Sequence, residues 1–140
     1  MDARFDEIKR TIVRLNQEVA AELGKQVFPV WDFSGYAAPN TEPAPARDGK
    51  AADWYAETVH FRPHLGDRVL DRIFGLEAKA DAEFGQRLDT GNLDLHFARW
   101  HAARRRYAAT HSDEVAEIEA LYRNWLAKQE WGIAPRGKEQ

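Results

Sequence analysis

The chain contains no cysteine among its 140 residues. This absence excludes a disulfide framework, a thiolate zinc site, an iron–sulfur cluster and a cysteine nucleophile. Long apolar runs are missing too, since no stretch approaches the roughly 20 residues that span a bilayer. The N-terminal sequence MDARFDEIKR is more charged than a signal peptide. From these features we expect no membrane span and a cytoplasmic location.

An excess of one charge is also lacking, because 20 Lys and Arg oppose 23 Asp and Glu and give a net charge of −3. The chain therefore has no global basic field of the kind that attracts nucleic acid, and we expect no nucleic-acid partner. Apolar residues make up 44% and charged residues 31%, a balance that can form a core. The length fits one ordinary domain.

Hydrophobic periodicity predicts about four helices. The first is defined by apolar residues spaced three or four apart, which share one face of a helix ending near Gly24. They are Phe5, Ile8, Ile12, Leu15, Val19 and Leu23. A second helix is predicted over residues 65–74, after a possible short helix within 53–61. Asn92 and Ser112 are typical first residues of a third and a fourth helix.

Only one short strand is predicted, over the β-branched and aromatic residues 27–33. A lone strand has no partner for its backbone N–H and C=O groups. Either the segment is a packed loop in a small helical protein, or it is one edge of a sheet whose other strands lie on another polypeptide or are lost. Residues 34–52 are rich in proline and predict a long loop, which is as compatible with a binding loop as with a plain linker.

Three segments resemble the carboxyl-terminal part of SGNH/GDSL-type hydrolases and their O-acyltransferase-like relatives. They are Trp31–Tyr36 (WDFSGY), Thr41–Pro43 and Tyr55–Gly66, and residues 84–121 resemble the helical tail of a subgroup of such proteins. The resemblance implies α/β ancestry, with this chain as part of a three-layer sandwich that is mostly α-helical, with about four helices and one short strand.

The same resemblance divides residues 1–140, taken as a single partial domain, into three segments. Residues 1–33 would hold a helix and the last sheet strand, residues 34–75 a histidine-bearing loop and a helix, and residues 76–140 the helical tail.

The family ends in an Asp-x-x-His block, in which the histidine is the general base and the carboxylate orients it. The matching residues are Glu57 and His60, so the resemblance implies these two as catalytic residues. Glu replaces Asp here, and Asp53 is a reserve candidate for the orienting carboxylate. The family's serine nucleophile and oxyanion donors lie upstream of the matched region, and Ser34 lacks the G-x-S-x-G context of a nucleophile elbow.

Two other interpretations of this block stay open. A histidine beside Phe61 is also explained as a core residue with a satisfied hydrogen bond. Glu57, His60 and His64 have metal-ligand spacing on a helix, but Pro63 disfavours the helical geometry that would align them. His96 and His101 are five apart and would not align on one helical face. We therefore expect no metal and no cofactor.

Two functions follow as hypotheses. The first is a truncated SGNH/GDSL-like protein of the ester or acyl-carbohydrate class, which is not catalytic alone and becomes an esterase or acyltransferase only with a chain that supplies the nucleophile. The second is a small helical, non-enzymatic protein-interaction module, in which Trp31, Tyr36 and the proline-rich loop meet a partner. Both predict exposed apolar surface, and with it self-association or a chain that supplies the missing sheet.

Overall fold

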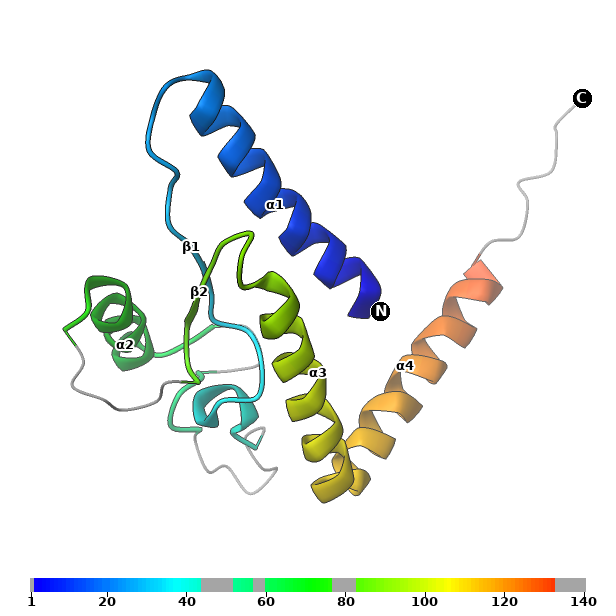
Figure 1. Ribbon diagram of the computed structural model, residues 1–140. Coiled ribbons are helices and arrows are strands. Elements are labelled where there is room, and N and C mark those ends of the chain that lie inside the picture. The colour runs from blue at the N-terminus through cyan, green and yellow to red at the C-terminus, as the bar shows by residue number, and fades with distance from the viewer. Residues whose placement is uncertain (1, 44–51, 57–59, 77–82, 133–140) are drawn as a thin grey trace, which may run out of the picture. The chain divides into compact units, whose positions relative to one another are not determined.

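A computed structural model describes residues 2–43, 52–56, 60–76 and 83–132 (Figure 1). The described chain is mostly helical, as predicted, and its four α-helices are α1 (Asp2–Glu22), α2 (Pro63–Phe74), α3 (Leu93–Thr110) and α4 (Ser112–Gly132). The chain divides into two compact units, residues 1–104 and residues 105–140. Within the described ranges, no helix combines the length and apolarity needed to cross a membrane.

The predicted strand is not alone. Strand β1 (Val30–Asp32) pairs in antiparallel register with β2 (Gln86–Leu88), so that Val30 lies opposite Leu88 and Asp32 opposite Gln86. The expectation of a strand without a partner in this chain was therefore wrong. The second strand escapes prediction because it is three residues long and only Leu88 is apolar, so it shows no alternation.

The segment 53–61 also differs from prediction, because its described residues do not form the expected short helix. Tyr55 instead forms an antiparallel bridge with Phe61. The backbone N–H of Ala56 donates to the carbonyl of His60 at 2.8 Å, and that of Arg62 donates to the carbonyl of Trp54 at 2.8 Å. Pro63 favours an extended Arg62, which lies at ψ 155°, so the helix begins only at Pro63.

Two small apolar clusters form the core of the first unit. One joins Val13 of α1 to Leu88 and to Leu93 and Phe97 of α3, with Val30 packed against it. The other contains Ala37, Leu65 and Phe84, and it is surrounded by the partly buried residues Phe33, Trp54, Tyr55 and Val69. The proline-rich loop contributes to the fold through the 3-10 helix η1 (Ala38–Thr41), whose Pro39 is fully buried.

Gly85 allows the chain to turn into β2 directly beside Phe33. Its φ of 76° lies in the left-handed region, which side chains other than glycine rarely adopt. A Cβ at this position would overlap Cε1 of Phe33 and lie 3.0 Å from Cγ of Arg72. The Gly85 carbonyl accepts a hydrogen bond from Nε of Arg72 at 3.0 Å, which ties α2 to the start of β2.

The second unit contains the end of α3 and all of α4. The rings of Tyr107 and His111 stack at 4.0 Å between centroids, and the Tyr107 hydroxyl donates to Glu114 at 2.7 Å. These contacts lie at the junction between α3 and α4. Asp113 and Glu114 stand in the first turn of α4, where carboxylates interact favourably with the helix dipole.

Candidate functional site

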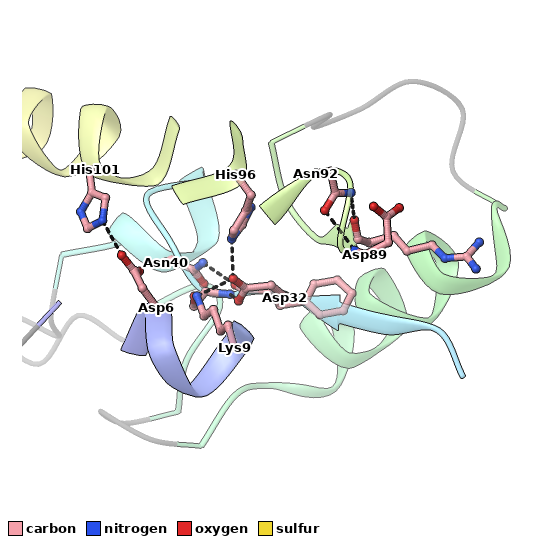
Figure 2. A network of polar contacts seen from close by, with 11 residues as sticks. Asp6, Lys9, Asp32, Asn40, Asp89, Asn92, His96 and His101 are labelled. Atoms are coloured by element: carbon pink, nitrogen blue, oxygen red, sulfur yellow. Dashed lines mark hydrogen bonds and ion pairs between the residues drawn. The ribbon is translucent and has the colours of Figure 1, made fainter. Parts of the chain in front are cut away.

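A buried carboxylate at the end of β1 joins three elements of the first unit. Oδ2 of Asp32 lies 2.5 Å from Nζ of Lys9 on α1 and 2.8 Å from Nε2 of His96 on α3. Oδ1 accepts a hydrogen bond from the backbone N–H of Ser34 at 2.9 Å. Figure 2 shows Lys9 and His96 reaching the same carboxylate from two different helices. We call Lys9, Asp32, Ser34 and His96 the Asp32 network.

The network determines the ionisation of Asp32. Burial alone would raise the pKa of Asp32, but hydrogen bonds from His96, Lys9 and Ser34 to the carboxylate outweigh it and hold the pKa far below its ordinary value of 3.8. Asp32 is therefore an anion at neutral pH. Because the ionised carboxylate can only accept a hydrogen bond, Nε2 of His96 carries the hydrogen in this contact. This position of the hydrogen is assigned from the hydrogen-bond pattern.

Ser34 is the hydroxyl of this network, and its contacts do not resemble those of a nucleophile. Nζ of Lys9 donates to Oγ of Ser34 at 3.0 Å while it is ion-paired with Asp32. A nucleophilic hydroxyl needs a neighbouring base that takes its proton, whereas Lys9 donates a hydrogen bond to this hydroxyl. The arrangement is therefore suited to joining helices and strand rather than to acyl transfer at Ser34.

A second histidine–carboxylate pair joins the same two helices. Nε2 of His101 on α3 lies 2.8 Å from Oδ2 of Asp6 on α1, as seen beside the Asp32 network in Figure 2. His96 and His101 thus bind separate carboxylates and do not converge on one point. Among the described residues, no group of three His, Cys, Asp or Glu side chains is placed to hold a metal ion.

The predicted catalytic block shares no residue with the Asp32 network. His60 is exposed and precedes the Phe61 bridge, while Glu57 lies outside the described residues. Asp53 is exposed, and its backbone N–H, like that of Trp54, donates to the carboxylate of Glu42. His64 lies in the first turn of α2 and packs its ring against Trp54 at 5.2 Å. The roles of Glu57 and His60 stay predictions.

Sequence reasoning missed the Asp32 network, although one signal for it was present. Asp32 stands between Trp31 and Phe33 in a segment predicted to be buried, and a buried carboxylate needs a partner. The partners are 23 and 64 residues away. Local spacing therefore could not identify them.

The helix α1 packs on the rest of its unit through a face that is largely polar. Asp6 and Lys9 bind His101 and Asp32, and Arg10 pairs with Asp94 at 2.6 Å. Gln17 donates to Thr90 at 3.2 Å, Val13 and Ala20 are buried, and Val13 belongs to the first apolar cluster. The packed residues follow the same spacing of three and four as the apolar residues, but they are offset by about one position.

The other large apolar residues of α1, and Leu23 directly after it, are consequently left about half exposed. We call Phe5, Ile8, Ile12, Leu15, Val19 and Leu23 the apolar row, and each of them is 46 to 62% exposed. This agrees with the prediction of exposed apolar surface, which rested on this helix and on residues 27–33. The rings of Trp31 and Tyr36, which we expected to meet a partner, pack against Phe33 and Trp100.

Comparison with known proteins adds nothing to these contacts: no family model, no curated protein and no solved structure matches the chain. The resemblance to SGNH/GDSL-type hydrolases thus stays a prediction from the sequence. The site must be interpreted from its own geometry.

Proposed function

We propose that the chain is a non-enzymatic interaction module that binds an amphipathic helix along the apolar row of α1. The observation that carries the proposal is the orientation of α1. Its polar face is docked through Asp6, Lys9 and Arg10, and its large apolar side chains are about half exposed. Contiguous apolar surface of this kind is typical of interaction sites.

The spacing of the apolar row favours a helix as the partner. Phe5, Ile8, Ile12, Leu15 and Val19 alternate steps of three and four, which are the a and d positions of a heptad repeat. In a coiled coil, each such side chain inserts between four side chains of a facing helix. A strand or an irregular loop offers no matching spacing.

The charges beside the row favour a protein partner over a lipid surface. Arg4 and Arg14 alternate there with Glu7 and Glu18, and Arg14 is itself paired with Glu18 at 2.9 Å. Helices that lie on membranes instead carry a polar face rich in Lys and Arg. Mixed signs are the usual surroundings of a helix–helix seam.

The row is large enough to support binding. Full burial of a large aliphatic or aromatic side chain contributes about 1.5–3 kcal/mol, so covering the exposed half of each contributes about 1 kcal/mol per residue. Summed along the row, this gives on the order of 5 kcal/mol, from which the entropy cost of association must be subtracted. Moderate affinity is the expected result.

The test uses a fluorescently labelled designed peptide with Ile at its a positions and Leu at its d positions. We expect saturable binding to the intact chain by fluorescence anisotropy, because the peptide offers the knobs and holes that the row requires. Ile12→Lys should abolish binding, since Ile12 is 48% exposed at the centre of the row. Leu95→Lys is the matched control, because Leu95 is 54% exposed on α3.

Circular dichroism should show that both variants keep the helical content of the parent chain. Equal binding by Ile12→Lys and Leu95→Lys, or no binding to the parent chain, would show that the apolar row is not the interaction surface.

A further inference from the structure

We infer that the helix bound by the apolar row is α1 of a second copy, aligned antiparallel. This inference rests on the proposed function and adds the identity and direction of the partner. It follows from where the charged residues Arg4 and Glu22 stand relative to the row. The heptad positions of both residues can be assigned directly from the spacing.

With Phe5, Ile12 and Val19 at a positions, Ile8 and Leu15 occupy d positions. The next d position is Glu22, the last residue of α1, and Leu23 follows it at an e position beside the seam. In a parallel, in-register pair each core position meets its own equivalent. Glu22 would then face Glu22 of the second copy in the seam, where two like charges repel. The parallel arrangement is therefore disfavoured.

An antiparallel pair places a residues of one helix opposite d residues of the other. Centring the two helices puts Ile12 against Leu15 of the second copy and Ile8 against Val19. The same register puts Phe5 against Glu22 of the second copy. Arg4 directly precedes Phe5, so its guanidinium can reach that carboxylate, and the two-fold symmetry produces this charge pair twice.

The other flank of the row is already used within the molecule. Lys9 follows Ile8 and is bound to Asp32 and Ser34. Asn16 follows Leu15 and exchanges hydrogen bonds with the backbone of Phe28 at 2.8 and 3.3 Å. A second helix therefore meets the row from the side of Arg4, Thr11 and Glu18. The charge complementarity of the dimer is thus concentrated in the pair of Arg4 and Glu22.

The first experiment is sedimentation equilibrium of the full chain, whose monomer mass is 16.0 kDa. We expect reversible dimerisation, and Arg4→Glu or Glu22→Arg should each weaken it roughly tenfold by replacing two attractive pairs with repulsive ones. The double variant Arg4→Glu/Glu22→Arg should restore the parent affinity. Arg99→Glu on α3 is the control for charge alone, because Arg99 is exposed outside the row.

The absence of native cysteine allows a second test of direction. Under oxidising conditions, a mixture of the variants Arg4→Cys and Glu22→Cys should give the mixed disulfide, because the antiparallel register brings these positions together. Preferential formation of each self-linked dimer would overturn the antiparallel arrangement.

A chain that stays monomeric while it binds the designed peptide would overturn the second copy as the partner and leave the proposed function intact. Dimerisation that is unaffected by Ile12→Lys would overturn the inference, since another surface would then be the interface, while peptide binding would still decide the proposed function. The apolar residues Val115, Ile118, Tyr122 and Trp125 of α4 have the same spacing. If Ile118→Lys abolishes dimerisation while neither Arg4→Glu nor Glu22→Arg affects it, the interface lies on α4. That result would overturn the inference.

Discussion

Nε2 of His96 lies 2.8 Å from Oδ2 of Asp32, which joins residues 64 positions apart in the sequence. The contact connects the first half of α3 to the end of β1. Lys9 brings α1 to the same carboxylate, so three elements depend on one side chain. The first two predictions concern this dependence.

Asp32→Asn should lower the free energy of unfolding by about 2–4 kcal/mol, because it leaves the partly buried Lys9 and His96 without their anion. The measurement is the urea midpoint, followed by circular dichroism. Asp94→Asn is the matched control, since its pair with Arg10 lies at the surface, with 89% of the Asp94 side chain exposed. Equal losses in the two variants would show that the Asp32 network contributes no more than a surface pair.

Acid should destabilise the chain through Asp32. Because hydrogen bonds hold the pKa of Asp32 well below 3.8 in the folded state, the unfolded chain takes up this proton first as the pH falls. The stabilisation that Asp32 gives the folded state is complete above the pKa that Asp32 has in the unfolded chain. It is lost progressively below about pH 4. Urea titrations at decreasing pH should show that the free energy of unfolding falls more steeply for the parent chain than for Asp32→Asn. Parallel pH profiles would contradict the lowered pKa.

Gly85→Ala should be far more destabilising than Gly75→Ala. Both glycines have positive φ, 76° and 69°, which costs an alanine about 1–2 kcal/mol. At Gly75 no atom lies within 4 Å of an added Cβ, whereas at Gly85 the Cβ overlaps the ring of Phe33. Thermal melts should therefore show a larger drop in melting temperature for Gly85→Ala than for Gly75→Ala. Similar melting temperatures would mean that Phe33 moves without cost.

The hydrolase interpretation makes its own prediction at His60. The purified chain should not hydrolyse a p-nitrophenyl acyl ester above the rate of His60→Ala, because the matched region lacks the family's nucleophile and Ser34 accepts a hydrogen bond from Lys9. The measurement is the release of p-nitrophenol. Activity that His60→Ala abolishes would show that the chain contains its own nucleophile or activates a water, and it would revive the enzymatic function.

The positions of the four α-helices could be predicted, but not the side that each buries, and the short helix expected within 53–61 does not form. Periodicity identified the start of α4 at Ser112 and the end of α2 before Gly75, since caps and spacing are local signals. Spacing also grouped the apolar row correctly. It could not show that Asp6, Lys9 and Val13 would be the docked residues, because their partners come from β1, β2 and α3.

The two strands illustrate the same limit. Val30–Asp32 was expected because it lies in the β-branched and aromatic segment 27–33, whereas Gln86–Leu88 has a single apolar residue and no such surroundings. Its pairing with β1 is a long-range contact, and a long-range contact leaves no spacing pattern in a single sequence.

The two faces of α1 give its polar contacts a role beyond stability. The docked residues and the apolar row are offset by one position, so a roll of the helix by about 100° about its axis would bring the row to the docked position. Hydrophobic burial favours the rolled position, but it would separate Lys9 from Asp32 and Asp6 from His101. These polar pairs therefore select the rotational setting of α1, and we expect them to keep the apolar row facing outward in the free chain.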